Sequence, residues 1–386
     1  MTEWKEYKLG DLIETNAKSI GKGYPYSKIL YLDTGSITCN KIESLQECEI
    51  GEAPSRAKRM VRKEDIIYSS VRPDQLHYGF IKNPQDNLVV STGFVTITCN
   101  KAILYPKFLY YYLIQSQITE YLHSVAEAST TAYPSLRSSD IEALDIEIPP
   151  IDEQKRIAGV LSSLDDKIDL LNRENTTLEA LAETLFRHYF IENPDPTWKE
   201  VSLSSIATFL NGLACQKYPP KDLINRLPVL KIKELSSGIT KDSDWATTDV
   251  GEEFIVHSGD VIFAWSASLM VKMWNGEDCV LNQHLFKVTS DIYPRWFYYL
   301  WCKYHLQEFI SIAQSHATTM GHIKRGDLDS AMVLVPSKNE METFTKQIEP
   351  LLKKVEVNYS QIKDLSIYRD NLLPRLISGE VKAGGQ

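Results

Sequence analysis

The stretch Trp198-Lys199-Glu200-Val201-Ser202-Leu203 decides the fold, because it repeats Trp4-Lys5-Glu6-Tyr7-Lys8-Leu9 from the start of the chain. Four further pairs of segments recur in the same order. They are Glu64–Ser69 and Gly259–Ala264, Tyr105–Tyr111 and Tyr293–Tyr299, Thr130-Thr131 with Asp140 and Thr318-Thr319 with Asp327, and Ile148–Pro150 and Val335–Ser337. The offset between equivalent residues drifts only from about 195 to about 187, which small loop deletions explain. Five pairs in register indicate a duplicated unit.

A long helical pattern closes each copy. In the first, apolar residues within 157–185 recur at spacings of three, four and seven, which predicts an apolar stripe along one helix face. The second pattern runs from about Glu340 to Ile377, and Pro374 and Gly379 are expected to end it. Each helix has roughly 35–40 residues and would span about 50–60 Å. Two helices with one apolar stripe each are expected to pair as a coiled coil.

The predicted architecture is therefore mixed α/β. Its parts are a first domain over 1–150, a central helix over 151–192, a second domain over 193–337, and a C-terminal helix and tail over 338–386. In the first domain, Ile66–Ser69, Val89-Val90 and Phe94–Thr98 predict strands, and Pro106–Val125 predicts a helix with an aromatic face. We expect two tandem α/β domains with curved sheets. The two helices would form an antiparallel coiled coil that relates the domains by a pseudo-two-fold axis.

Aromatic stripes at Tyr110–Tyr112 and Phe297–Tyr299 are expected to lie in the two cores.

The chain has 386 residues, of which 43% are hydrophobic, enough for two globular units. No run of about 18 apolar residues occurs, and the N-terminus is charged, so neither a membrane span nor a secretory signal is expected. Six scattered cysteines fit a reduced, cytoplasmic protein. The net charge of −9 weighs against nucleic acid, although an acidic chain can carry a local basic surface.

No catalytic motif is visible. The sequence contains neither a P-loop nor a Gly-x-Gly-x-x-Gly loop, and no His-Glu-x-x-His or Cys/His ligand set suggests a metal. An amino-methyltransferase would carry a segment of the Asn-Pro-Pro-Tyr kind. The nearest segment, Asn193–Pro196, lies between helix and second domain and is typical of a proline-rich linker. We therefore expect no enzyme active site, cofactor or metal on this chain.

The arrangement resembles the specificity subunits of Type I restriction-modification systems over nearly the whole chain. The motifs that carry the resemblance are the two Trp segments, the strands that begin at Asp65 and Asp260, the two Thr-Thr segments, Pro149-Pro150 followed by Glu153-Gln154, and Leu372–Glu380. Two departures stand out. Glu64 replaces the usual glycine that Gly259 retains, and Pro336–Glu340 lacks the Glu-Gln pair.

The resemblance implies a non-catalytic, cytoplasmic subunit of a DNA adenine methyltransferase and restriction complex, acting in phage defence. Its two target-recognition domains would each read half of a split sequence in double-stranded DNA, with half-sites about one helical turn, near 34–36 Å, apart. The helices would set the undefined gap and dock two methyltransferase subunits, through which restriction subunits join. S-adenosylmethionine is expected on those methyltransferase subunits and not on this chain.

Candidate DNA contacts follow from residue type, since lysine and arginine neutralise phosphates and arginine also reads guanine. For the two loops that contain the Thr-Thr segments, the resemblance favours a DNA-facing role. The candidates in the first domain are Lys18, Lys22, Arg56, Lys58, Arg59, Ser69, Arg72, Thr130, Thr131, Tyr133 and Arg137. The matching candidates in the second are Lys217, Trp265, Ser266, Gln283, His284, Thr318, Thr319, His322 and Lys324. The alternatives are solvated turns and surface cations, an ion pair for Arg72, a core position for Trp265, and a buried hydrogen-bonded pair for Gln283 and His284.

Two other functions remain open. An enzyme would need a hidden site and would show turnover by the isolated chain. A duplicated coiled-coil scaffold would use the two domains to bind protein partners instead of DNA. Salt-sensitive binding to a split-sequence duplex would distinguish a DNA reader from that scaffold.

Overall fold

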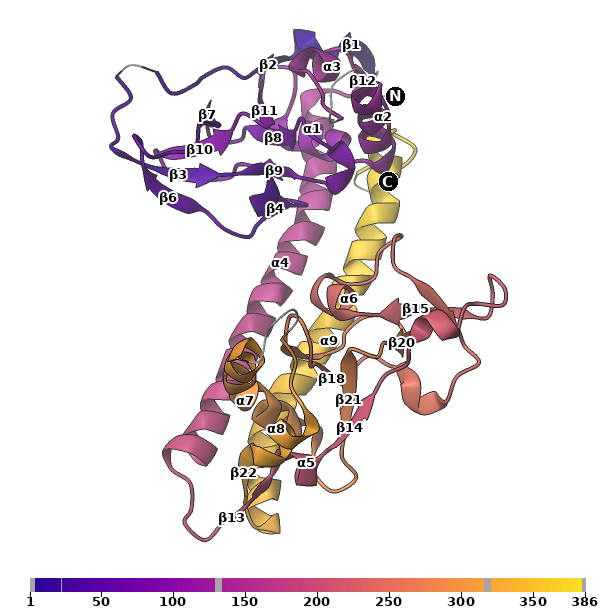
Figure 1. Cartoon of the computed structure of the whole chain (residues 1–386). Coiled ribbons are helices and arrows are strands. Elements are labelled where there is room, and N and C mark those ends of the chain that lie inside the picture. The colour runs from indigo at the N-terminus through magenta and orange to yellow at the C-terminus, as the bar shows by residue number, and fades with distance from the viewer. Residues whose placement is uncertain (1–3, 22, 129–133, 316–320, 384–386) are drawn as a thin grey trace. The chain divides into compact units, whose positions relative to one another are not determined.

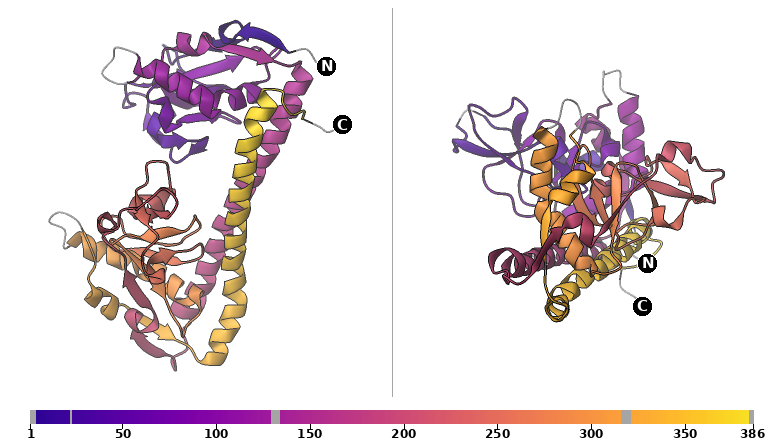
Figure 2. Two further views of the ribbon diagram at one scale, coloured as in Figure 1. Left: turned by 90° about the vertical axis from the view of Figure 1, so that its right-hand side faces the viewer. Right: turned by 60° about the horizontal axis from the view of Figure 1, so that its bottom comes forward.

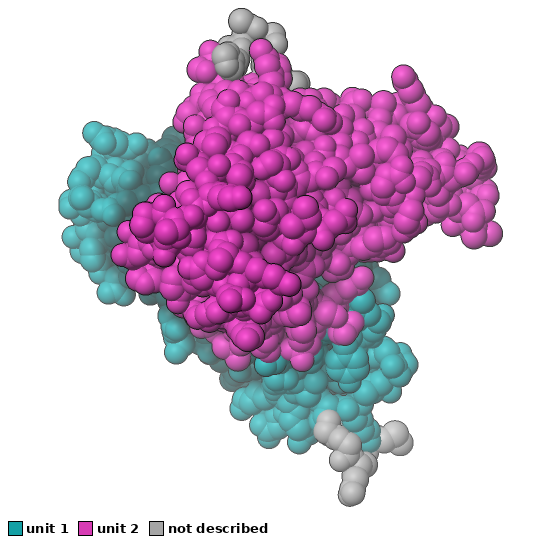
Figure 3. Space-filling model, turned by 90° about the horizontal axis from the view of Figure 1, so that it is seen from below, with its two compact units in different colours: residues 1–167, 365–386 teal, residues 168–364 magenta. Residues whose placement is uncertain are grey.

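The computed structural model describes residues 4–21, 23–128, 134–315 and 321–383. It divides into two compact units (Figure 3), one formed by residues 1–167 with 365–386 and the other by 168–364. Each unit contains one α/β domain together with parts of both long helices. The boundary between units therefore cuts each helix instead of separating helices from domains.

The first domain contains two four-stranded sheets. In order across the first sheet, the strands are β2 (Ile13–Thr15), β11 (Phe94–Cys99), β8 (Ile66–Ser69) and β9 (Tyr78–Phe80). Across the second, they are β6 (Gln46–Glu49), β3 (Lys28–Leu32), β10 (Leu88–Ser91) and β7 (Ala57–Met60). Two small pairs join β1 (Lys5–Lys8) with β12 (Asp145–Ile148) and β4 (Ile37–Thr38) with β5 (Lys41–Ile42). The helices are α1 (Pro106–Leu113), α2 (Ser116–Glu127) and α3 (Ser138–Glu142).

The second domain repeats this topology. Its first sheet orders β14 (Thr208–Asn211), β21 (Leu285–Thr289), β18 (Val261–Ala264) and β19 (Met270–Met273). Its second orders β16 (Trp245–Thr247), β15 (Arg226–Leu230), β20 (Cys279–Leu281) and β17 (Ile255–Val256). The small pair joins β13 (Lys199–Ser202) with β22 (Met332–Val335). The helices are α5 (Leu203–Ile206), α6 (Ile232–Ser237), α7 (Arg295–Ser315) and α8 (Arg325–Ser330).

Strand pairing confirms the duplication. The parallel pair β3 and β10 in the first domain matches β15 and β20 in the second, and all neighbouring pairs in the two main sheets of each domain are otherwise antiparallel. The three predicted strands of the first domain are confirmed. The prediction of one helix over Pro106–Val125 is wrong, because the chain becomes extended at Gln115 (φ −60°, ψ 140°) between α1 and α2. In the second domain the helix α7 runs unbroken.

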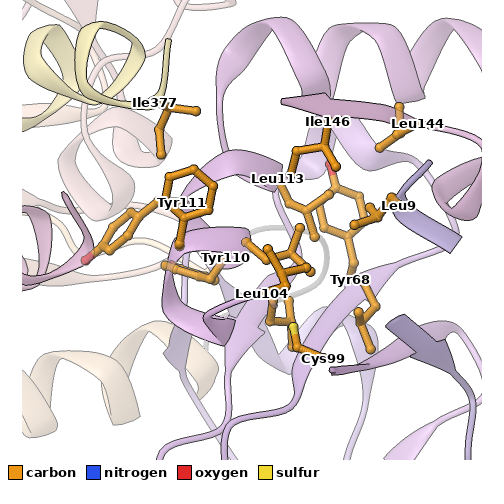
Figure 4. Packing of buried hydrophobic residues seen from close by; sticks show 14 of the residues in the cluster. Leu9, Tyr68, Cys99, Leu104, Tyr110, Tyr111, Leu113, Leu144, Ile146 and Ile377 are labelled. Carbon is orange, nitrogen blue, oxygen red and sulfur yellow. The ribbon is translucent and has the colours of Figure 1, made fainter. Parts of the chain in front are cut away.

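Both aromatic stripes lie in the cores, as predicted. In the first unit, Tyr110 and Tyr111 are buried with Leu9, Leu104 and Ile146 (Figure 4). In the second unit, Phe297, Tyr298 and Tyr299 are buried in a cluster that also holds Trp296 and Trp301. These large side chains bury much of the apolar area that stabilises each unit.

The long helices are α4 (Ile151–Arg187), which continues as a π-helical turn over His188–Glu192, and α9 (Lys338–Ile377). They pack against each other (Figures 1 and 2). In the second unit, Asn175 bonds to Asn358 and Tyr189 bonds to Gln347, so the two helices run antiparallel.

The end of α9 differs in one respect from the prediction. Pro374 does not end the helix, because a proline in the last turn removes only one backbone N–H. The helix ends three residues later at Ile377, and Gly379 follows with φ +75°. None of the helices described in the structure is long and apolar enough to cross a membrane.

Candidate nucleic-acid interface

Three polar segments of the first domain meet at the end of β8. Leu136 N donates to Ser70 O at 2.7 Å, and Arg72 N donates to Pro134 O at 3.2 Å, which joins the loop after β8 to the loop before α3. The Ser70 hydroxyl donates to Gly93 O at 2.8 Å and brings in the turn between β10 and β11. Arg72 takes φ +47°, so its side chain starts from a strained left-handed backbone.

The basic residues of the first domain lie next to these loops. Strand β7 forms one edge of its sheet, and the segment Lys18–Ile20 pairs with it: Met60 N donates to Lys18 O at 3.0 Å, and Ile20 N to Lys58 O at 2.8 Å. Thr92 N donates to Arg56 O at 2.8 Å, which links this edge to the turn that Ser70 contacts. The predicted residues Lys18, Arg56, Lys58, Arg59 and Arg72 therefore belong to one connected set of loops and strands.

We call Arg56–Lys63 the basic strand; its five cations are Arg56, Lys58, Arg59, Arg62 and Lys63. In the described part of the chain, none of the five lies within ion-pair distance of a carboxylate, whereas Lys8 and Lys82 of the same unit pair with Asp145 and Asp166. Burial lowers the pKa of Arg59, although its guanidinium remains charged at neutral pH. Uncompensated cations on this strand and on the residues that flank it favour a polyanion as ligand.

In the second domain the equivalent loops are joined in the same way, but they carry different side chains. Ser266 pairs with His322 as Val71 does with Ser135, and Ala267 takes φ +58° where Arg72 takes +47°. Ile323 N donates to Trp265 O at 3.1 Å, and Trp265 N to His284 O at 3.3 Å. The same backbone platform thus carries an arginine in one domain and an alanine in the other.

Around that platform the predicted residues form what we call the tryptophan cluster: Trp265, Ser266, Gln283, His284 and His322. The Ser266 hydroxyl lies 3.1 Å from His284 Nδ1, and Gln283 Nε2 lies 3.4 Å from His284 Nε2. The Trp265 ring is partly exposed and lies 6.0 Å from the His284 ring, centroid to centroid. Imidazole and amide groups beside an indole ring can bond to base edges and contact thymine methyl groups.

One member of this site, Asn211, is missing from the residues predicted from the sequence. Trp265 Nε1 donates to Asn211 Oδ1 at 3.1 Å, which orients the indole ring. The neighbouring Gly212 is the available signal, because a Cβ there would lie 2.3 Å from Asn282 O, so that only glycine fits.

Several predicted residues have other positions. Ser69 is buried, and its hydroxyl donates to Val71 O at 2.8 Å, so it supports the loop from inside. Arg137 and Lys324 are exposed and start α3 and α8, where their backbone N–H groups donate to Asp140 and Asp327 at 2.7 Å. Lys217 is exposed at the end of a short 3-10 turn. The remaining predicted residues, Lys22, Thr130, Thr131, Tyr133, Thr318 and Thr319, lie outside the described residues.

The Asp motifs are structural. Asp65 is buried and accepts from Arg62 N at 2.7 Å, and Asp260 accepts from His257 N at 2.8 Å, so each carboxylate fixes the turn before its strand. Burial, the main cause, raises the pKa of Asp65. Glu64 takes φ +72° where Gly259 takes +95°, so the unusual residue adopts a left-handed backbone too.

The first turns of the two long helices are more alike than the comparison of their sequences indicated. Since α4 begins at Ile151 and α9 at Lys338, Glu340 corresponds to Glu153, and Met341 alone replaces Gln154. Gln154 is fully buried, accepts from Tyr105 N at 2.8 Å and donates to Pro149 O at 2.8 Å. Glu340 instead accepts from Trp198 Nε1 at 3.1 Å. The described residues contain no cluster of three His, Cys, Asp or Glu side chains that could hold a metal.

The fold is a duplicated pair of α/β domains joined to two long paired helices, and comparison with known proteins identifies the family. The family model of the Type I restriction modification DNA specificity domain matches residues 1–180 and again 196–365. The chain therefore belongs to the Type I restriction-modification specificity subunits.

Individual relatives cover the whole chain at low identity. The Type I restriction enzyme HindI specificity subunit of Haemophilus influenzae is 24% identical over 99% of this chain and 100% of its own length. The MjaIX specificity subunit of Methanocaldococcus jannaschii is also 24% identical, over 99% and 89%. The crystal structure of a Type I restriction-modification S subunit from M. genitalium matches with a TM-score of 0.54 at 15% identity, covering 97% of this chain and 96% of that one. This likeness supports the fold.

Proposed function

We propose that this chain is the non-catalytic DNA reader of a Type I complex, in which each domain recognises one half of a split target in double-stranded DNA. Two methyltransferase subunits would dock on it and carry S-adenosylmethionine, and restriction subunits would join through them.

The basic strand carries the proposal. The chain has a net charge of −9, and four other lysines of the first domain pair with carboxylates, namely Lys8, Lys28, Lys82 and Lys101. The five cations of the basic strand have no such partner within the described ranges. Leaving cations uncompensated favours a ligand with closely spaced negative charge. DNA backbone contacts position a protein on the duplex, and the adjacent loop with Arg72 would then reach base edges.

The tryptophan cluster would read the second half-site. Its polar groups belong to Ser266, Gln283, His284 and His322. Such groups would contact bases through hydrogen bonds more than through charge. The two domains would therefore differ in chemistry on the same platform, with arginine in the first and imidazole and amide groups in the second. A split target with two different halves is the expected consequence.

The long helices offer surfaces for the methyltransferases. In the first unit, Val160, Ile367 and Tyr368 are exposed on α4 and α9, and in the second unit Leu170, Leu181 and Val357 are exposed. Exposed apolar residues repeated along helices are typical of protein docking sites. We propose that these faces bind the partner subunits and that the length of the helix pair determines the gap in the target.

The test is to co-express the chain with the methyltransferase encoded beside it, purify the complex, and map methylated adenines in DNA exposed to it. The expected result is one motif with two defined halves and a fixed gap, together with binding of that duplex that weakens steeply with salt. A complex that methylates nothing, or a chain that holds protein partners with no affinity for the duplex, would support the scaffold instead.

A further inference from the structure

The loop before β15 carries two large apolar side chains that are almost fully open to solvent. Leu223 is 78% exposed and Ile224 is 88% exposed, and we call this pair the loop tip. Among large hydrophobic residues in the described ranges, only Ile292 at 81% is comparable. The hydrophobic effect opposes such exposure, so the loop tip contributes nothing to the core of its domain.

Hydrogen bonds and an ion pair fix the conformation of this loop, although the two side chains at its tip are exposed. Asp222 Oδ1 accepts from Ile224 N at 2.8 Å and from Asn225 N at 2.6 Å, and Asp222 Oδ2 accepts from Asn225 Nδ2 at 3.0 Å. Lys221 pairs with Asp249 at 2.7 Å, which ties the loop to the rest of the domain. A tip with its backbone already fixed loses little conformational entropy on binding.

The loop that carries the tip is longer in the second domain than in the first. Tyr24-Pro25 and Tyr218-Pro219 occupy the same place before β3 and β15, but β3 begins four positions after Tyr24 and β15 begins eight positions after Tyr218. The second domain is therefore four residues longer at this place, in the segment that includes the loop tip. In the first domain, the residues a few positions before the corresponding loop, Lys18–Ile20, pair with the basic strand.

The second domain also lacks the charge that would hold DNA in the first. The residues that correspond to the basic strand precede and form β17 and include Glu252 and Glu253. His257 is the basic residue there, and it lies within 3.1 Å of Glu252 and 3.0 Å of Asp278. This edge would repel phosphates, so the second domain needs another source of affinity for the duplex.

We propose that the loop tip is an apolar wedge that enters a groove of the DNA and partly unstacks one base step at or beside the second half-site; this inference rests on the proposed function. Two side chains are far too small a patch for a stable protein interface, which needs about 800 Å² on each partner. Leucine and isoleucine wedges of this size do separate base steps and bend the duplex, which lets more of the protein reach it. The exposed Lys217 on the same loop can contact the adjacent backbone.

The experiment uses the complex with its methyltransferase subunits and a synthetic duplex that carries its own mapped motif. 2-Aminopurine, which fluoresces more strongly when unstacked, replaces one adenine at a time across the second half-site and its flank, except the adenine that is methylated, because methyltransferases flip their target base out of the stack. The wild-type complex is expected to increase fluorescence several-fold at one step. The double variant Leu223→Ser/Ile224→Ser is expected to abolish that increase and to weaken binding by about tenfold.

The control is Ile292→Ser, which removes an equally exposed side chain from the same domain and should leave both readings unchanged. If the wild type binds the duplex but fluorescence rises at no step, or if the double variant behaves as wild type, the wedge is refuted while the proposed function stands. If the double variant instead fails to co-purify with the methyltransferase, the tip is a protein contact and the wedge is also refuted. If the wild type does not bind the duplex at all, the proposed function fails and the wedge fails with it.

Discussion

Asn358 Nδ2 donates to Asn175 Oδ1 at 2.8 Å between α9 and α4, and both side chains are almost completely buried. The same Nδ2 group donates to Glu174 Oε2 at 2.9 Å. A buried polar pair in an otherwise apolar helix seam stabilises little but favours one alignment of the two helices. Asn175 and Asn358 therefore define which turn of α4 faces which turn of α9.

The first prediction concerns this pair. Asn358→Leu should lower the free energy of unfolding by about 1–3 kcal/mol, because it leaves Asn175 Oδ1 buried without a donor. The double variant Asn175→Leu/Asn358→Leu should recover much of that stability, since neither buried group is then orphaned. Urea unfolding of the four proteins of this double-mutant cycle measures the coupling. Additive effects would show that the two side chains do not interact.

The second prediction concerns the left-handed residue before each Asp motif. Gly259→Ala should destabilise by about 1–2 kcal/mol, because alanine disfavours φ +95° and its Cβ would lie 2.7 Å from Arg295 Nη1, which donates to Gly259 O. Glu64→Gly should change stability by less than about 1 kcal/mol, since relief of strain offsets the flexibility gained when unfolded. Thermal unfolding compares the two variants. Equal destabilisation would mean that the two turns are not equivalent.

The duplication and the helices could be predicted because their signals are local. The helices follow from a period of 3.6 residues over more than thirty positions, and the duplication follows from five ordered repeats. Both signals can be recognised without knowing which distant residues are in contact. The order of strands is different, since β3 pairs in parallel with β10, a partner almost sixty residues away. The second domain has the same parallel pair, β15 with β20, although no local sequence signal predicts it.

The candidate site was only partly predictable for a related reason. Which cations stay unpaired depends on partners far along the chain, such as Asp145 for Lys8. Basic residues can be counted in the sequence, but the sequence does not show which of them form ion pairs. Asn211 and Trp265 are likewise joined only by the sheet. Leu223 and Ile224 have the composition of a core segment, and nothing local indicates that they are exposed.

The third prediction tests the basic strand. Arg56→Gln, Lys58→Gln and Arg59→Gln should each weaken duplex binding and should together reduce the slope of log K against log salt by about 2–3, at roughly 0.9 for each phosphate that is no longer neutralised. The matched control is Glu252→Gln/Glu253→Gln on the corresponding edge of the second domain, which removes acidic charge where no phosphate is neutralised and should not reduce that slope. Filter binding from about 50 to 200 mM salt gives both slopes. An unaltered slope in the triple variant would place the DNA elsewhere.

The fourth prediction follows from His257. Hydrogen bonds to Asp278, the larger cause, and to Glu252 raise its pKa above the ordinary value. A raised folded pKa contributes stability that is fully present below the unfolded pKa of about 6.5 and is lost as pH rises through the folded value. The side chain is half exposed, so the effect is small. His257→Gln should cost more unfolding free energy at pH about 6 than at pH about 9, and equal costs at both would contradict the ion pairs.

The last prediction concerns the paired helices as a spacer. Inserting four residues, about one turn and 6 Å, between Lys167 and Ile168 in α4 and between Asp364 and Leu365 in α9 lengthens both helices at the boundary of the two units while keeping Asn175 and Asn358 paired. If the helix pair sets the gap, the methylated motif should keep its two halves and gain about one or two undefined base pairs, because each base pair rises about 3.4 Å. Insertion in α4 alone should disrupt the pair and abolish methylation. Methylation mapping reads out all three proteins, and an unchanged gap in the doubly lengthened protein would show that something other than helix length determines the spacing.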